Sequence, residues 1–457
     1  MELRKRMFYN ILTEKIILPL SDLVLKSSLS STFKKWQALS LSSKESIESL
    51  QLKNLQETLA FTIENVPYYK KQNIKASTDA KEFLSNFPIL TKDILRTEKL
   101  LSVNNTKGLI KRSSSGSSGI PSTVYMSQDE VSRIAAIQAL WWSWSGYRFG
   151  DKVLQMGNNP KRGLIKKIKD VLLRFKYEDA FSLNEDDIVV LLNELRESPC
   201  TYLLGYASSL YSIAKTAEKY KIDDIRFTSV LSLGDKMFEH YRKTIEKQFS
   251  TQVYDSYGCS EGLMMSGQCE AGNYHIMTPH VYLEILDDEG KEVQPGQIGH
   301  VVATRLDSKI MPLIRYKLGD LAIKSDSNEI CSCGRNFPLL SKIIGRETDL
   351  LQLASGKFAT VHSFTGIFEY YAEIYQFQVV ELDDGVMIRY IAADGFKKEV
   401  LEEIKMKIHE KIDDTLKVIF KEEKVISPTA SGKPCIVMSK EQAKKYSDDI
   451  GKGYINE

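Results

Sequence analysis

The sequence has few cysteines, almost no net charge and no long apolar run. Six cysteines in 457 residues are too few for a disulfide framework, which favours a reducing, cytoplasmic setting and makes the clustered cysteines candidate metal ligands. A formal charge of +2 gives no global sign of a nucleic-acid partner. No window of about eighteen residues is wholly apolar, so we expect no transmembrane helix.

The first 25 residues are apolar but interrupted. Glu14, Lys15 and Asp22 break the stretch, and no small-residue cleavage site follows it, which argues against a signal peptide. We expect an amphipathic helix that packs on the body of the protein, and peripheral contact with a membrane surface is the alternative.

Patterning predicts an α/β protein of two domains. The first, 1–345, should be a large multi-layer α/β domain with mixed sheets, and its first 105 residues read as mostly helical. Helices and strands alternate over 106–345, as in a largely parallel sheet with crossover helices, although 281–325 looks like hairpins. The second, 346–457, should be a small, mobile α+β domain.

A Ser/Gly-rich segment lies between two strand-like stretches, Gly108–Arg112 and Ser122–Met126. Exposed backbone N–H groups and hydroxyls in such a loop suit the oxygens of a polyphosphate, whereas a flexible linker would lack strands on both sides. The candidate residues are Ser114, Ser115, Gly116, Ser117, Ser118 and Gly119.

Two shorter motifs follow. In Tyr257-Gly258-Cys259-Ser260-Glu261, the ring of Tyr257 could face a purine and Glu261 could bind Mg²⁺. In Arg315-Tyr316-Lys317-Leu318-Gly319-Asp320, Asp320 could accept both hydroxyls of a ribose. Each motif taken alone could equally be an ordinary turn.

The last motif has two parts, Gly345-Arg346 at the expected domain boundary and the loop Pro428–Lys433. Lys433 could reach a carboxylate or an α-phosphate as a point charge. A solvated lysine on a turn is the alternative.

In this order and spacing, the motifs resemble the adenylate-forming ligases, the superfamily of acyl-CoA synthetases and peptide-synthetase adenylation domains. The resemblance covers about residues 60–440. Within the superfamily the chain resembles the phenylacetate–CoA ligases and their CapK-like relatives in capsular polysaccharide synthesis. The residues that carry this are Val66–Tyr69, Phe87–Thr91, Gly205–Leu210, Cys331–Arg335 and Phe377-Gln378.

The resemblance implies that ATP and a small carboxylic acid form an acyl-adenylate and pyrophosphate, and that the acyl group then passes to CoA. An amine or hydroxyl acceptor is a second reading, and a non-catalytic nucleotide-binding relative is a third. A homodimer is compatible with each. Two departures from the family pattern support the third reading: Ser122 stands where lysine is usual, and Thr348 stands where aspartate is usual.

The resemblance also implies a role for each motif. The Ser/Gly segment would hold the β- and γ-phosphates, and Glu261 with Ser117 or Ser118 would hold Mg²⁺. Tyr257 and Gly258 would line adenine on one side, and Gly234 with Asp235 would line the other. Asp320 and Arg346 would bind the ribose, and Lys433 would bridge the carboxylate and the α-phosphate.

Cys269, His275, Cys331 and Cys333 supply three thiols and one imidazole, a standard tetrahedral set for structural zinc. They fall within an insert near 259–335. The alternative is a set of buried, reduced cysteines with a surface histidine, and Cys259 is a substitute ligand. Candidates for an apolar acyl pocket are Trp141, Trp142, Trp144, Tyr147 and Tyr206, which could equally be core residues.

Overall fold

The computed structural model describes residues 2–103, 106–113, 122–157, 163–180, 183–346, 350–353, 358–368, 370–371, 373–393, 395–426, 436–440 and 443. The chain forms two compact units. Unit 1 comprises Met1–Met237 and Tyr241–Ile343, and unit 2 comprises Phe238–His240 and Ile344–Glu457. None of the described helices is long and apolar enough to cross a membrane.

Unit 1 begins with helices. They are α1 (Glu2–Leu12), the π-helical turn η1 (Thr13–Ile17), α2 (Leu18–Leu25), α3 (Leu29–Leu39), α4 (Lys44–Asn65), α5 (Pro67–Lys70), α6 (Ala80–Ser85) and α7 (Lys92–Thr97). Local sequence sets several of these ends. Ser43 and Asp79 cap α4 and α6 with side-chain oxygens, and Pro67 begins a new helix directly after α4.

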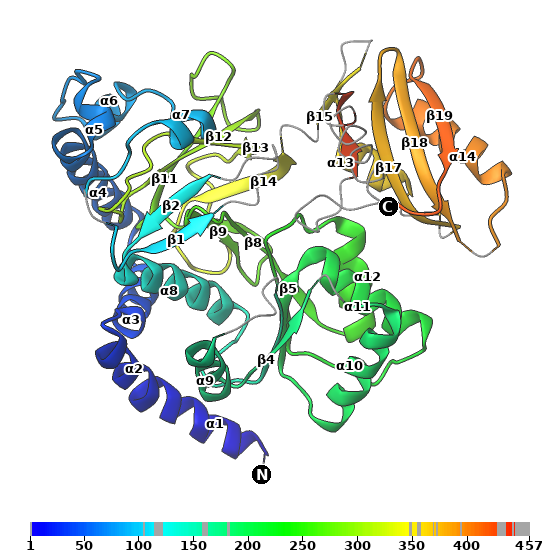
Figure 1. The fold of residues 1–457 in the computed structure, drawn as a ribbon, viewed down its shortest axis with the longest axis horizontal. Coiled ribbons are helices and arrows are strands. Elements are labelled where there is room, and N and C mark those ends of the chain that lie inside the picture. The colour runs from blue at the N-terminus through cyan, green and yellow to red at the C-terminus, as the bar shows by residue number, and fades with distance from the viewer. Residues whose placement is uncertain are drawn as a thin grey trace, which may run out of the picture. The chain divides into compact units, whose positions relative to one another are not determined.

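A five-stranded parallel sheet forms one layer of unit 1 (Figure 1). In sheet order its strands are β4 (Phe175–Asp179), β3 (Val153–Gly157), β5 (Tyr202–Tyr206), β6 (Ser229–Leu233) and β7 (Gln252–Tyr254). The associated helices are α8 (Gln128–Trp144), α9 (Leu164–Leu173), α10 (Glu185–Glu197), α11 (Ala207–Lys219) and α12 (Glu239–Phe249). β3, β5 and β6 are almost wholly buried, as expected for a sheet with helices on both faces.

A seven-stranded sheet forms the second layer. In sheet order its strands are β11 (Val281–Leu286), β12 (Ile298–Arg305), β13 (Tyr316–Lys324), β14 (Leu339–Arg346), β10 (Tyr274–Ile276), β9 (Met264–Gln268) and β8 (Ser256–Gly258). The hairpin predicted within 281–325 is confirmed, because β11 pairs antiparallel with β12.

A separate two-stranded ribbon consists of β1 (Ile110–Ser113) and β2 (Thr123–Met126). The two strands are antiparallel, and Ser113 lies opposite Thr123. Both strand-like flanks of the Ser/Gly segment are therefore strands, as the sequence predicts.

Unit 2 is a small α+β assembly. Its elements are β15 (Leu350–Gln352), β16 (Phe358–Thr360), α13 (Val361–Phe368), β17 (Ile374–Leu382), β18 (Gly385–Ala392), α14 (Glu399–Lys411), β19 (Lys417–Glu422) and β20 (Val437–Met438). The main sheet has the order β19-β18-β17-β20, and α14 packs against α13. The expected fold class, a large α/β part followed by a small α+β part, is confirmed.

Candidate functional site

The parallel sheet presents Tyr206, Gly234 and Asp235 where β5 and β6 end. Ligands of open α/β sheets bind beyond the carboxyl ends of the strands. Gly234 has φ +81°, and a Cβ placed on it would come within 2.4 Å of the Tyr206 ring, so only glycine fits there. The Asp235 carboxylate accepts from the Ser208 hydroxyl at 2.6 Å and from the backbone N–H of Ala207, and thereby caps α11.

The two nucleotide motifs meet in the other sheet. The Tyr257 hydroxyl, on β8, donates to the Asp320 carboxylate, on β13, across 2.7 Å. Gly258 is the last residue of β8, and Gly319 has φ +80° directly before Asp320. The residues predicted separately to contact adenine and ribose are thus neighbours.

Glu261 lies beside the same strand. Its carboxylate accepts from the Tyr316 hydroxyl at 3.1 Å and from the adjacent Ser260 hydroxyl at 3.1 Å, and the residue is buried. Both partners are neutral donors, so the carboxylate keeps its negative charge available. A hard, anionic oxygen in this position fits Mg²⁺.

A buried charge cluster holds the backbone next to Glu261. His280 donates from Nε2 to the Gly262 carbonyl at 3.1 Å and from Nδ1 to Asp307 at 2.8 Å. Arg305 donates to the other Asp307 oxygen at 2.9 Å. Burial raises the pKa of Asp307, but His280 and Arg305 outweigh it and hold that pKa well below its usual range. Sequence reasoning missed this cluster, since no motif contains its members.

A second ion pair fixes the start of β13. Arg315 bonds Glu284 on β11 at 3.0 Å and the Phe87 carbonyl at 3.1 Å. The Leu90 N–H donates to the Arg315 carbonyl at 2.9 Å, and Leu90 forms an isolated parallel β-bridge with Tyr316. The segment Phe87–Thr91, noted in the sequence only for its resemblance, therefore supports the strand that carries Tyr316 and Asp320.

The predicted metal ligands come together. One ligand atom each from Cys269, His275, Cys331 and Cys333 lies within 4.8 Å of the other three. The two thiols of Cys269 and Cys331 are 3.6 Å apart, and Cys333 Sγ is 3.2 Å from His275 Nε2. The alternative of a surface histidine is wrong, because His275 is fully buried.

The surroundings of this cluster suit a metal ion. His275 Nδ1 lies 3.1 Å from the Phe337 carbonyl, which orients Nε2 toward the sulfurs, as is usual for a ligating histidine. Burial lowers the pKa of His275, and the neutral imidazole is the form that binds metal. Burial raises the pKa of Cys269 to about 12, so a cation would be needed to stabilise its thiolate.

Trp141 and Trp144 belong to the core around this cluster, whereas Trp142 belongs to another. Trp144 packs edge-on against His275 at 5.6 Å and lies under the Arg335 guanidinium at 4.9 Å. Trp141 lies against the backbone of Gly267. Trp142 packs on Tyr147 at 5.6 Å. Of the five candidates for the acyl pocket, Tyr206 contacts the candidate site, because its ring packs against Gly234.

Several predicted residues cannot be placed. Ser114, Ser115, Gly116, Ser117, Ser118, Gly119, Thr348 and Lys433 lie outside the described residues. Arg346 is the last residue of β14 and is exposed. Ser122, which stands where the family pattern has lysine, is fully buried.

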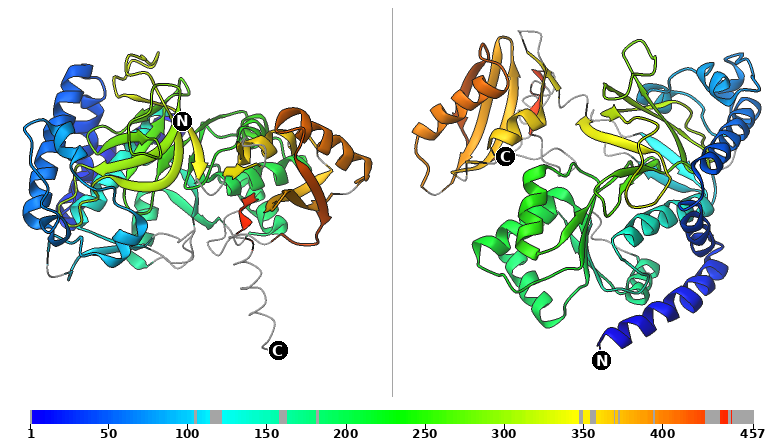
Figure 2. Two further views of the ribbon diagram at one scale, coloured as in Figure 1. Left: turned by 90° about the horizontal axis from the view of Figure 1, so that it is seen from above. Right: turned by 180° about the vertical axis from the view of Figure 1, so that it is seen from behind.

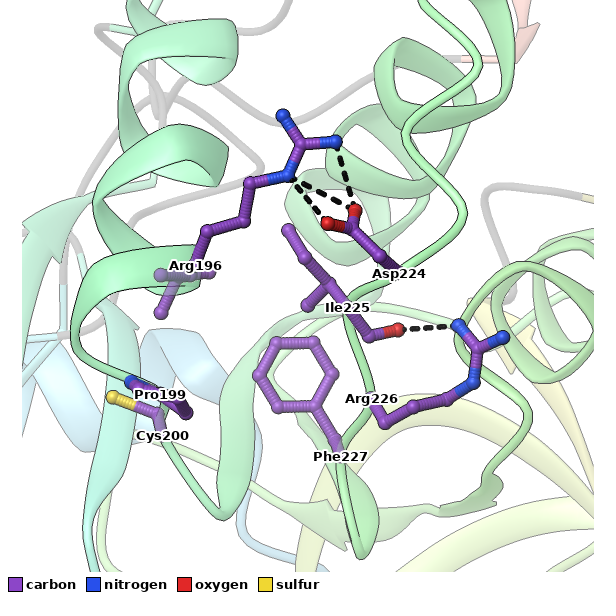
Figure 3. Close-up of a pocket in the computed structure, with 8 residues that line it drawn as sticks. Arg196, Pro199, Cys200, Asp224, Ile225, Arg226 and Phe227 are labelled. Atoms are coloured by element: carbon purple, nitrogen blue, oxygen red, sulfur yellow. Dashed lines mark hydrogen bonds and ion pairs between the residues drawn. The ribbon is translucent and has the colours of Figure 1, made fainter.

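A pocket at the opposite edge of the parallel sheet does not belong to the site (Figure 3). Pro199 and Cys200 precede β5, and Phe227 precedes β6, so the pocket lies at the amino ends of the strands. Its three charged side chains already have partners: Arg196 bonds Asp224 at 2.8 Å, and Arg226 donates to the backbone carbonyls of Asp223 and Ile225.

No family model matches the chain, but comparison with known proteins finds similar ligases. It is 26% identical to a phenylacetate–coenzyme A ligase of Thermus thermophilus over 329 residues, 67% of this chain and 72% of that protein. It is 24% identical to the protein CapK of Staphylococcus aureus over 376 residues, 79% of this chain and 82% of that protein. The fold matches that of a 2-hydroxyisobutyryl-CoA ligase in the postadenylation state with a TM-score of 0.70 at 18% identity, over 88% of this chain and 91% of that one.

The fold is that of the adenylate-forming ligases, and the converging motifs indicate an AMP-forming ligase. In sequence, the chain is similar to the phenylacetate–CoA ligases and to CapK, the branch that its motifs resemble.

Proposed function

We propose that this protein activates a small carboxylic acid with ATP and transfers the acyl group to CoA. The observation that carries the proposal is the meeting of the two nucleotide motifs, where Tyr257 bonds Asp320 and Tyr316 bonds Glu261. An aromatic ring, a ribose-binding carboxylate and a metal-binding carboxylate at one place form the essentials of an ATP site.

In the first step, a carboxylate oxygen attacks the α-phosphorus of ATP. The bond from that phosphorus to the bridging oxygen breaks, and pyrophosphate leaves. Asp320 orients the ribose, and Glu261 would hold Mg²⁺, which when bound would offset the charge that develops on the leaving pyrophosphate. Positioning and electrostatics account for the rate, because no protein atom forms a covalent bond.

Lys433 and the Ser/Gly segment complete this site in the proposal. Lys433 neutralises the carboxylate and the α-phosphate as they approach each other, and the backbone of Ser114–Gly119 binds the β- and γ-phosphates. Arg346 and Asp320 share the ribose. These roles rest on the family resemblance of the motifs.

In the second step, the CoA thiolate attacks the acyl carbonyl, the thioester forms and AMP leaves. Similarity to CapK over 79% of the chain supports a second candidate, in which an amine or hydroxyl replaces the thiol. Pyrophosphate release from ATP, measured with a panel of carboxylic acids and with or without CoA, separates these readings. Thioester formation supports the first, an adenylate that CoA does not consume supports the second, and no turnover with any acid refutes both.

We further propose that Cys269, His275, Cys331 and Cys333 hold a structural Zn²⁺. Support comes from the convergence of their ligand atoms within 4.8 Å and from the position of His275 Nε2. Four protein ligands leave no open position for substrate, so the ion would brace the two loops rather than take part in the reaction.

A further inference from the structure

The N-terminal helices expose a stripe of large apolar side chains. Phe8, Ile11, Ile16, Leu20 and Leu23 follow one another at steps of three, five, four and three residues. Residues three or four apart share one side of an α-helix, and the five-residue step falls on the wider π-helical turn η1. The π turn therefore keeps the stripe on one side, where Phe8 is 70% and Leu23 is 77% exposed. Val24, directly after Leu23, is 78% exposed.

Helix α9 exposes a second apolar face. Ile168, Val171 and Leu172 are spaced for one side of this helix, and Val171 is 76% exposed. The two helices are in contact, because the Tyr9 hydroxyl on α1 donates to the Leu172 carbonyl at 3.0 Å. Figures 1 and 2 show α1, α2 and α9 at the same edge of unit 1.

The charges of these helices are arranged asymmetrically. Of the acidic side chains on these helices, Glu14 is engaged by Arg148 at 2.6 Å and Asp22 by the backbone N–H of Ser30 at 2.7 Å, and Asp170 of α9 also has a partner. Six exposed basic residues form no ion pair with any residue that the structure describes. They are Arg4, Lys5, Lys15, Lys26, Lys166 and Lys167.

We propose that the surface formed by α1, η1, α2 and α9 docks on an anionic lipid bilayer. Apolar side chains on one side of a basic helix insert at the level of the headgroups, and lysines and arginines pair with anionic lipids. A second copy of the chain is a poorer occupant. Pairing this surface with itself would bring two sets of unpaired cations together without acidic partners.

Co-sedimentation with vesicles tests this proposal. Vesicles of phosphatidylcholine with phosphatidylglycerol should bind the protein, vesicles of phosphatidylcholine alone should bind it far less, and high salt should release it. The double variant Leu23→Asp/Val24→Asp should lose binding. Lys166→Glu/Lys167→Glu should weaken it by roughly fivefold or more per cation. Val190→Asp, which alters an exposed apolar residue of α10, should bind as the parent does.

Thermal melting followed by circular dichroism shows whether each variant is folded. If Leu23→Asp/Val24→Asp is unfolded, Lys166→Glu/Lys167→Glu tests the proposal in its place. The proposal is overturned if the parent binds neither type of vesicle. It is also overturned if light scattering shows a dimer that Leu23→Asp/Val24→Asp dissociates, because the surface is then a self-interface.

Discussion

His280 and Asp307 form a buried ion pair, 2.8 Å between Nδ1 and the carboxylate, and His280 Nε2 donates a hydrogen bond to the carbonyl of Gly262, next to Glu261. Glu261, the proposed Mg²⁺ ligand, therefore lies on a loop whose backbone is fixed by a hydrogen bond from the buried His280–Asp307 pair. A loop fixed in this way needs little reorganisation when ATP and Mg²⁺ bind.

Asp307→Asn should lower the free energy of unfolding by about 3 kcal/mol at pH 7, because it leaves buried cations without their partner. The folded-state pKa of Asp307 is lowered, so its contribution is present above the unfolded pKa of about 3.9 and is lost as the pH falls below it. Urea unfolding at pH 7 and near pH 3 measures both effects, and the difference between parent and variant should shrink in acid.

Asp288→Asn is the matched control, since Asp288 bonds His300 at 2.6 Å but is almost fully exposed. It should change stability little. If the two substitutions lower the free energy of unfolding equally, burial does not determine how much each pair contributes to stability.

Tyr257→Phe removes the hydroxyl that orients Asp320 and should raise the KM for ATP about tenfold with little change in kcat. Steady-state kinetics with varied ATP check this. Tyr220→Phe, at the end of α11, should leave both constants unaltered. An unchanged KM in Tyr257→Phe would mean that the hydrogen bond has no part in nucleotide binding.

Glu261→Gln keeps the shape of the side chain but removes its charge. We expect kcat/KM to fall about 10²- to 10³-fold and the Mg²⁺ needed for half-maximal activity to rise. A Mg²⁺ titration of adenylate formation measures this, with Glu289→Gln on an exposed turn as control. The assignment of Glu261 to Mg²⁺ is refuted if the titration curves coincide.

Cys331→Ser should reduce bound zinc from about one ion per chain to a small fraction and lower the melting temperature by about 10 °C. Elemental analysis of protein purified without chelators gives the metal content. Cys200→Ser changes a buried cysteine outside the cluster and should keep the metal. Full zinc occupancy in Cys331→Ser, or no zinc in the parent, contradicts the proposed site.

The sequence predicts what local chemistry determines. β-branched and aromatic residues identify the strands β1 and β2. The residue types and spacing of Cys269, His275, Cys331 and Cys333 identify the metal-ligand cluster. Ordered motifs predict the superfamily. In each case the informative residues are close in the sequence or have few other plausible roles.

Other parts of the site depend on contacts that only the fold creates. His280 and Asp307 are ordinary residue types, and nothing local marks their contact with each other and with Gly262. Large aromatic side chains suit a pocket and a core equally, so Trp141 and Trp144 could not be assigned until their packing beside the cysteine cluster was known. The motifs predict Asp235 beside adenine. Its capping of α11 could not be predicted, because that helix starts 28 residues earlier in the chain and only the fold brings the two together.

Carboxylate-dependent exchange of labelled pyrophosphate into ATP tests adenylate formation most directly, because it needs no knowledge of the acceptor. We predict exchange that requires both a carboxylic acid and Mg²⁺, and that falls at least about 10²-fold in Lys433→Ala while Lys440→Ala retains it. Exchange that is absent with every acid, or that is equal in the parent and Lys433→Ala, would contradict the proposed reaction.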